Sequence, residues 1–163
     1  MQANHQLAFL QEKISDLGSA IFFNLSDSLL KLPTSIITTQ KVDEYGFIWF
    51  YMQKPKQDLR EFEKEFPVRL DFFRKGKDYF LQVTGKAWLV ADPEEMNSME
   101  LGVEEMKAVE QMILVKVKML KADYHETQMS TRSSWWQNTV NYVQTWFGSS
   151  NGVYGREVFH PAS

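Results

Sequence analysis

The sequence contains no cysteine, and this absence excludes several kinds of chemistry at once. Without thiols the chain can form no disulfide, use no thiolate nucleophile and offer no sulfur ligand to a metal ion. The three histidines, His5, His125 and His160, are too scattered to make a metal-binding pattern with one another or with nearby carboxylates. We therefore expect no metal site. The lack of cysteine is compatible with a reducing cytoplasm.

Other common signals are also missing. No apolar run approaches the roughly 20 residues that a membrane-spanning helix needs, and residues 1–11 lack the apolar core of a signal peptide. The 18 basic and 21 acidic residues give a net charge of -3, without the basic surplus common in nucleic-acid-binding proteins. Neither a Walker motif, a dinucleotide loop nor a Ser-His-Asp pattern is present. We expect a soluble cytoplasmic protein that binds neither membrane nor nucleic acid.

Aromatic side chains, in contrast, are abundant, at 14% of the chain. Hydrophobic residues make up 44% and charged residues 24%, which is the balance of a globular domain. The length of 163 residues fits a single domain, residues 1–163, with a core of ordinary size. So many aromatic residues are typical of thick β-packing, a planar ligand or a large interface.

Two β-hairpins are the clearest local prediction. In the first, a β-branched stretch at 34–42 precedes a tight turn with Gly46, and an aromatic strand returns at 47–52. In the second, Gly76 lies in the turn between strands at 68–74 and 79–91. Gly85 lies inside the longer strand, where a glycine often marks a bulge or a barrel bend.

The remaining periodicity predicts helices and two more strands. Apolar spacing favours helices at about 5–17, 54–65, 92–109 and 134–147, the last of them rich in aromatic residues. Short apolar or alternating runs favour strands at 20–25 and 112–124. Because tight turns join most of the strands, we expect a small antiparallel β-barrel, whose closure removes exposed strand edges.

Residues 42–50, with the sequence VDEYGFIWF, resemble the pattern VDEDGxLWF of a known family of flavoproteins. These are the FMN-binding split barrels related to pyridoxamine 5'-phosphate oxidase, of the general stress protein type. The family's next hairpin ends in GxAxxxxD, which Gly85, Ala87 and Asp92 match, and its closing strand looks like the segment LVKVKMLKADYHE. The resemblance spans roughly residues 15–126. It implies a mainly β fold of the α+β class, a small antiparallel split β-barrel with flanking helices.

The resemblance also implies a cofactor and a partner. Members of this family are usually homodimers that hold two FMN molecules in grooves between the subunits. For this chain it implies a homodimer that binds FMN, or another planar phosphorylated molecule, through Ser35, Thr38, Trp49, Tyr51, Lys54, Lys56, Gln82 and Trp135. If the chain is an enzyme, it is then an FMN-dependent oxidoreductase whose redox chemistry belongs to the flavin.

The chain departs from the family at two phosphate-binding positions. Where the family has an RPM triplet, this sequence reads Ser35-Ile36-Ile37, so the arginine is missing. Asp58 stands where the family has a cation, and an anion beside a phosphate is unfavourable. Lys54 and Lys56 could take over this role, because a lysine acts as a point charge and tolerates some displacement.

Simpler structural explanations stay open for all of these residues. The basic cluster at 54–60 could be a solvated surface, and Thr38 could be an ordinary strand former. Trp49 could belong to the core, and the helix at 134–147 could pack against the barrel or form a dimer contact. Two other functions also stay open. One is a non-catalytic, stress-associated or ligand-binding barrel that has lost its phosphate clamp, and the other is a haem protein using His125.

Overall fold

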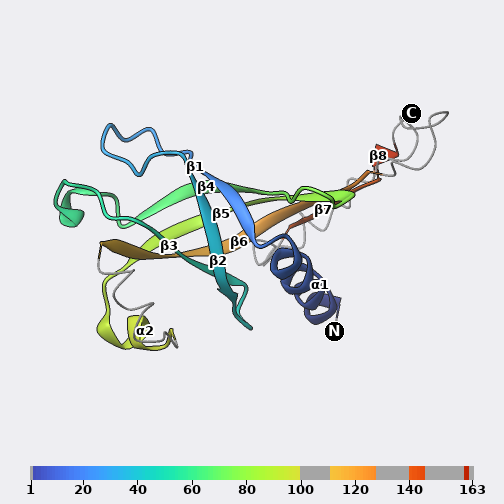
Figure 1. Ribbon diagram of the computed structural model, residues 1–163, viewed down its shortest axis with the longest axis horizontal. Helices are drawn as coiled ribbons and strands as arrows, with labels where there is room; N and C mark the ends of the chain where they lie inside the picture. Colours follow the sequence, from blue (N-terminus) through green and yellow to red (C-terminus); the bar gives the residue numbers. More distant parts are fainter. Residues whose placement is uncertain (1, 100–110, 128–139, 146–159, 162–163) are drawn as a thin grey trace.

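The computed structural model describes residues 2–99, 111–127, 140–145 and 160–161, and the structural statements below concern these ranges. Along the chain (Figure 1) it contains α1 (Gln2–Leu17), β1 (Ser19–Asn24), β2 (Ser35–Val42), β3 (Phe47–Gln53), the 3-10 turn η1 (Leu59–Glu61), β4 (Glu65–Phe72), β5 (Tyr79–Val90), α2 (Pro93–Asn97), β6 (Met112–Glu126), β7 (Val140–Thr145) and β8 (His160–Pro161). Helix α1 includes the helix expected at about 5–17. No helix in the described ranges is long and apolar enough to cross a membrane.

The described strands form one antiparallel sheet in the order β3-β2-β1-β4-β5-β6-β7-β8, and a further pairing of β3 with β6 closes the first six into a barrel. Strand β2 pairs with β1 through residues 35–38 and with β3 only between Thr39 and Val42. Strands β2 and β3 therefore diverge toward the start of β2, which splits the barrel wall. This confirms the expected split barrel, mainly β with flanking helices.

Side chains that point inward fill the barrel completely. Alternation along each strand directs apolar residues to the interior, as expected for a sheet with one buried face. Members of this core that are at most 2% exposed include Ala20, Phe22, Ile37, Ile48, Phe50, Val68, Leu70, Leu81, Val83, Val115 and Val117. The apolar face of α1 joins the same core. Because protein interiors pack this densely, a ligand as large as a nucleotide has to bind outside the barrel.

Gly85 marks a bulge between β5 and β6, as its position in the sequence predicts. The register of the two strands shifts between Thr84 and Gly85. A Cβ atom at Gly85 would lie only 2.0 Å from the backbone oxygen of Lys118, so only glycine permits this approach. The two hairpin turns are confirmed as well, with positive φ angles of 86° at Gly46 and 89° at Gly76.

The helix predicted at 54–65 is wrong. Only η1 is helical in this segment, and the chain then enters β4 at Glu65. Pro67 lies near the start of β4 and is paired with Lys86 of β5. A proline is tolerated at this end of the strand, where its carbonyl still accepts the backbone N–H of Leu25 at 2.9 Å.

The aromatic helix predicted at 134–147 is also wrong in its described part. Residues Val140–Thr145 form β7, which pairs antiparallel with the end of β6. Strand β6 continues past its pairing with β3, so this part of it offers an edge to another strand. Valine, tyrosine and threonine are favoured in β-strands, so this segment suits a strand at that edge. The remaining residues of this predicted helix, and those of the one at 92–109 beyond Met99, lie outside the described ranges.

Candidate ligand-binding site

The outer face of β3 carries the aromatic residues that the sequence connects with a planar ligand. Trp49 packs in a small cluster with Val90, Met99 and Leu114, and only 6% of it is exposed. Its indole N–H donates a hydrogen bond of 2.9 Å to the Asp43 carboxylate. Trp49 is therefore a fixed, mostly covered wall of this face.

A pocket with a basic rim lies at the end of the barrel where β3 stops. Its volume is about 550 Å³, within the range of small-molecule sites. Apolar side chains that include Trp88, Val90 and Leu114 form its walls, and Lys54 and Lys64 are among the charged residues that line it. We call this the basic-rimmed pocket. The apolar walls and the lysine ammonium groups of this pocket suit a ligand with an apolar body and an anionic end.

A second pocket, of about 400 Å³, is bordered by residues of α2 and by the outer face of β3. Phe47, Trp49 and Lys116 line it together with the acidic residues Asp43, Asp92, Glu94 and Glu95. The ammonium of Lys116 is 2.6 Å from the Glu95 carboxylate, so that cation is already neutralised. This acidic pocket disfavours a phosphate, and the two pockets differ clearly in charge.

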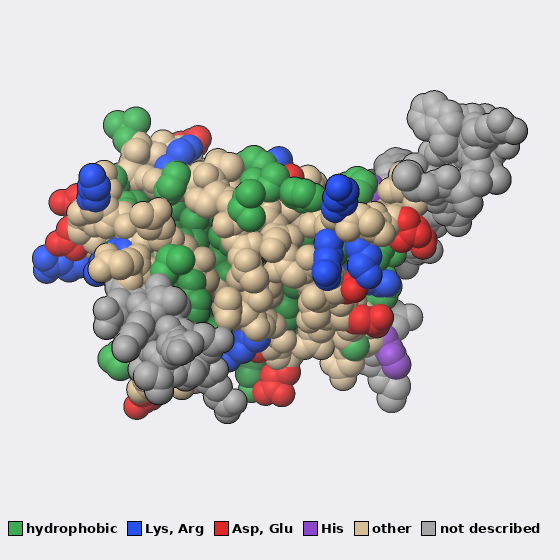
Figure 2. All heavy atoms as spheres, viewed as in Figure 1, with side chains coloured by type: hydrophobic (Ala, Val, Ile, Leu, Met, Phe, Trp, Pro, Cys, Tyr) green, Lys and Arg blue, Asp and Glu red, His purple; other side chains and the backbone are tan. Residues whose placement is uncertain are grey.

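Asp58 proves to be a local structural residue. Its carboxylate accepts the backbone N–H of Arg60 at 2.9 Å, which caps η1, and also pairs with the Arg60 guanidinium at 2.7 Å. These contacts hold the pKa of Asp58 below its ordinary value. Lys54 and Lys56, in contrast, are exposed and have no ion-pair partner in the described part of the chain. Figure 2 shows basic and acidic side chains at the end of the molecule where η1 lies, and a second charged group toward the opposite end.

The predicted residues of β2 lie beside the split in the barrel wall. The Ser35 hydroxyl donates a hydrogen bond of 2.9 Å to the carbonyl of Pro33, and Thr38 is exposed. Tyr51 is half-buried, and this burial raises the pKa of its hydroxyl. Because β2 and β3 are antiparallel, the start of β2 lies toward the end of β3 that leads to Lys54. The structure thus places Ser35, Thr38 and Tyr51 on the two adjacent strands β2 and β3.

Gln82 lies elsewhere. It is on the outer face of β5, where its amide donates a hydrogen bond of 3.1 Å to Asp71. Two strands separate β5 from β2 in either direction around the closed barrel, so Gln82 faces the side opposite Thr38. Near it, His125 stacks on Phe80 with ring centroids 4.4 Å apart. Trp135 lies outside the described residues.

The sequence reasoning missed two features of this face. Trp88 lines the basic-rimmed pocket, and alternation along β5 was an available signal, because Trp88 and Val90 share the outer side of that strand. The acidic pocket carried no such signal, since its residues come together only where the β2–β3 turn meets α2. Within the described ranges, no three His, Cys, Asp or Glu side chains gather in a way that could hold a metal ion.

Comparison with known proteins agrees with this architecture. Residues 6–145 match the family model described as pyridoxamine 5'-phosphate oxidase like. A protein related to general stress protein 26, from Clostridium acetobutylicum, superposes with a TM-score of 0.62 at 10% identity, covering 88% of this chain and 96% of its own. A general stress FMN/FAD binding protein from Xanthomonas citri gives a TM-score of 0.57 at 18% identity, with 76% and 93% covered.

A third solved structure is a pyridoxamine 5'-phosphate oxidase-related, FMN binding protein from Nostoc punctiforme. It gives a TM-score of 0.56 at 8% identity and covers 86% of this chain and 87% of its own. No curated protein sequence matches the chain. At these identities the solved structures establish the fold alone, whereas the family model matches most of the sequence. The chain therefore belongs to the pyridoxamine 5'-phosphate oxidase-like family.

Proposed function

We propose that this chain binds FMN on the outside of the barrel, at a site shared by two copies of the chain. The observation that supports this most is the position of the predicted residues around a filled core. Thr38 and Gln82 face opposite sides of the closed barrel, so one ligand cannot reach both within a single copy. In a homodimer, Gln82 of the second copy can approach the β2–β3 side of the first.

The charges near β3 support the same proposal. Lys54 and Lys56 are exposed cations without partners among the described residues, so they would hold the phosphate of the flavin. Lys54 and Lys64 outnumber Glu63 in the lining of the neighbouring basic-rimmed pocket, and the pairing with Arg60 neutralises Asp58, which stands at a family cation position. Ser35, Thr38 and Tyr51 would contact the rest of the cofactor from the open side of the barrel.

The flavin, when bound, would supply transfer of a hydride or of electrons, as flavins do. The chain's own residues would bind and orient it and restrict the access of water. FMN binding by the proteins from Xanthomonas citri and Nostoc punctiforme supports this cofactor. We infer a cytoplasmic, single-domain, FMN-dependent oxidoreductase of the pyridoxamine 5'-phosphate oxidase type.

One observation favours a second candidate, a barrel that binds a ligand without catalysis. The position of the family arginine holds Ser35, whose hydroxyl is already bonded to Pro33, so one phosphate contact is lost. The two candidates differ in FMN affinity and in turnover: the barrel that has lost its phosphate clamp would bind FMN weakly or not at all, and only the oxidoreductase would reduce the flavin with a donor and pass the electrons on.

Binding is tested by titrating FMN with the purified protein and following the loss of flavin fluorescence. We expect saturable quenching, and a bound flavin with absorbance near roughly 450 nm. Reversing the charge at both Lys54→Glu and Lys56→Glu should weaken the affinity by about 100-fold, since two charge-assisted contacts are lost. Lys75→Glu, in the turn at the other end of the barrel, is the control and should bind as the parent does. Equal affinity of all three proteins would contradict the proposed phosphate site.

A further inference from the structure

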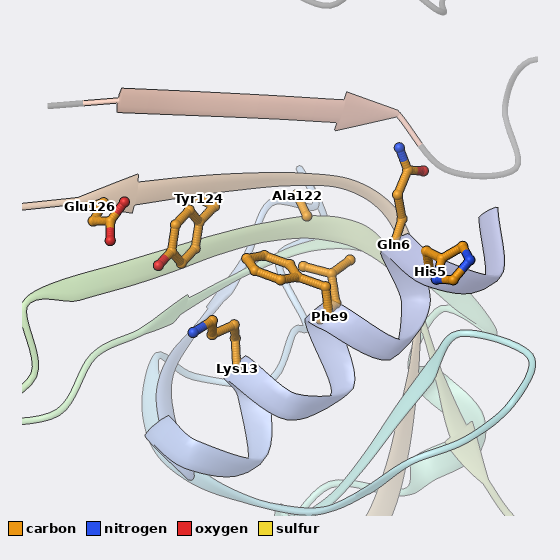
Figure 3. A pocket seen from close by; sticks show the side chains of 8 residues that line it. His5, Gln6, Phe9, Lys13, Ala122, Tyr124 and Glu126 are labelled. Atoms are coloured by element: carbon orange, nitrogen blue, oxygen red, sulfur yellow. The ribbon is translucent and has the colours of Figure 1, made fainter. Parts of the chain in front are cut away.

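A groove runs between helix α1 and the end of strand β6, away from the outer faces that carry the proposed flavin residues. Its volume is about 480 Å³ and its walls are mostly apolar, with Phe9, Leu10, Ala122 and Tyr124 along its length. Figure 3 shows Lys13 and Glu126 toward one end of this groove and His5 and Gln6 toward the other. We call it the α1–β6 groove.

Aromatic contacts make one wall of the groove rigid. Phe9 meets Tyr124 edge to face with ring centroids 5.1 Å apart, and Tyr79 lies 5.6 Å from Tyr124. The Tyr79 hydroxyl donates a hydrogen bond to the carboxylate of Asp16, which fixes that ring from behind. Phe9 nevertheless remains 39% exposed, so the groove presents an apolar ring surface that a bound molecule could cover.

The ammonium of Lys13 lies among these rings. It is 4.7 Å from the Tyr79 centroid, 5.4 Å from that of Phe9 and 5.9 Å from that of Tyr124. Ring faces attract a cation, but they do not supply the negative charge that would neutralise it. No carboxylate of the described residues pairs with Lys13, so its charge is available to an anion in the groove.

Glu126 provides the opposite charge at the same end. Its carboxylate lines the groove, and it too has no ion-pair partner within the described ranges. A ligand with only an anionic group would satisfy Lys13 but would be repelled by Glu126, and a cationic ligand would meet the reverse problem. A ligand with both charges close together satisfies the two residues at once.

We propose that the α1–β6 groove binds a free amino acid with an apolar, preferably aromatic, side chain. The α-carboxylate of this ligand pairs with Lys13, its α-ammonium pairs with Glu126, and its side chain packs along Phe9, Leu10 and Ala122. The volume of the groove is at the lower end of the range for small-molecule sites, which suits a ligand of this size. The site uses none of the residues that the proposed flavin site requires.

The test compares four small molecules by calorimetric or NMR titration of the full chain. L-Phenylalanine carries all three features, whereas 3-phenylpropionate lacks the ammonium, phenethylamine lacks the carboxylate and glycine lacks the ring. We expect saturable binding of L-phenylalanine. Each of the other three molecules lacks one charged or apolar contact, so its affinity should be lower by about tenfold at least. Equal binding of 3-phenylpropionate and L-phenylalanine, or no saturable binding of L-phenylalanine, would overturn the proposal.

Two variants locate the site. Lys13→Gln and Glu126→Gln should each weaken L-phenylalanine binding by about tenfold, because each removes one ion pair. Lys75→Gln, an exposed lysine in the β4–β5 turn, is the matched control and should bind normally. The Glu126 side chain makes no hydrogen bond or ion pair with the described residues, so Glu126→Gln should fold even if the Lys13 variant does not, and the test can then rest on Glu126→Gln alone. Unchanged affinity of Glu126→Gln would show that the ligand binds elsewhere.

Discussion

The two faces of β3 show how differently one strand can be used. Toward the interior, Ile48 and Phe50 are fully enclosed in the barrel core. One residue away on the outer side, Phe47 and Tyr51 are only partly buried, and Trp49 is covered by a small separate cluster. The inner face determines the fold, because its side chains are buried in the core of the barrel. The outer face borders the acidic pocket and leads to the basic-rimmed one, so it is the face available for binding.

The largest expected difference is in stability when each face is truncated. Phe50→Ala should lower the free energy of unfolding by about 3–5 kcal/mol, because it leaves a cavity in a closed core. Tyr51→Ala, on the neighbouring residue, should lower it by about 1 kcal/mol or less, since it removes surface pairing only. Urea unfolding of both variants measures the contrast. Equal losses would show that the outer face is as important to the fold as the core.

A smaller loss is expected at the bulge between β5 and β6. Gly85→Ala should destabilise the protein by about 1–3 kcal/mol, because the new methyl group collides with the backbone of β6. Lys86→Ala, at the exposed next residue, is the control and should change stability little. Thermal unfolding of the pair reports the effect. A Gly85→Ala variant as stable as its control would mean that the barrel closes without the close approach of β5 and β6.

On the outer face, Trp49→Phe should cost about 1 kcal/mol, the usual net value of one hydrogen bond. The substitution keeps a ring in the cluster but removes the bond from the indole N–H to Asp43. Asp43 still accepts the backbone N–H groups of Tyr45 and Phe47, both at 2.9 Å, so the hairpin turn should survive. Chemical unfolding measures the change, and a loss as large as that of Phe50→Ala would contradict the separation of the two faces.

The smallest effect is a pH dependence that arises at the α1 end of the core. Burial and the hydrogen bond to Asp16 raise the pKa of Tyr79 above its ordinary value of 10.0. The folded chain therefore holds this proton more tightly than the unfolded chain, so the associated stability is present below pH 10 and declines as the pH rises above it. Tyr79→Phe should lack this decline. Melting temperatures of both proteins between pH 8 and 11 provide the test, and parallel curves would exclude the contribution.

Much of the barrel could be predicted from the sequence, because hairpins leave strong local signals. Gly46 and Gly76 mark turns that require positive φ angles, and alternation along β5 and β6 marks the inner face. Segments 54–65 and 140–145 misled because apolar residues spaced for one helix face also suit extended chain. Segment 140–145 pairs with the edge that β6 offers, whereas 54–64 forms a loop around η1, and no local pattern reveals either outcome.

The candidate site was less predictable for a different reason. The order of the hairpin predicts that Ser35, Thr38 and Tyr51 lie on neighbouring strands, and the structure has them on β2 and β3. Gln82 could not be placed, since its relation to them depends on barrel closure and, in our proposal, on a second copy. The charge difference between the two pockets depends on α2 and η1, whose positions relative to the strands leave no trace in spacing.

The most direct test of the central claim is FMN binding by a mixture of two defective variants. One variant carries Lys54→Glu and Lys56→Glu, and the other carries Gln82→Ala, so each should bind FMN more weakly than the parent. If two copies build each site, co-expression of the variants should restore binding at about a quarter of the sites, because random pairing leaves that fraction with both parts intact. No recovery on co-expression, with both variants folded, would contradict a site shared between copies.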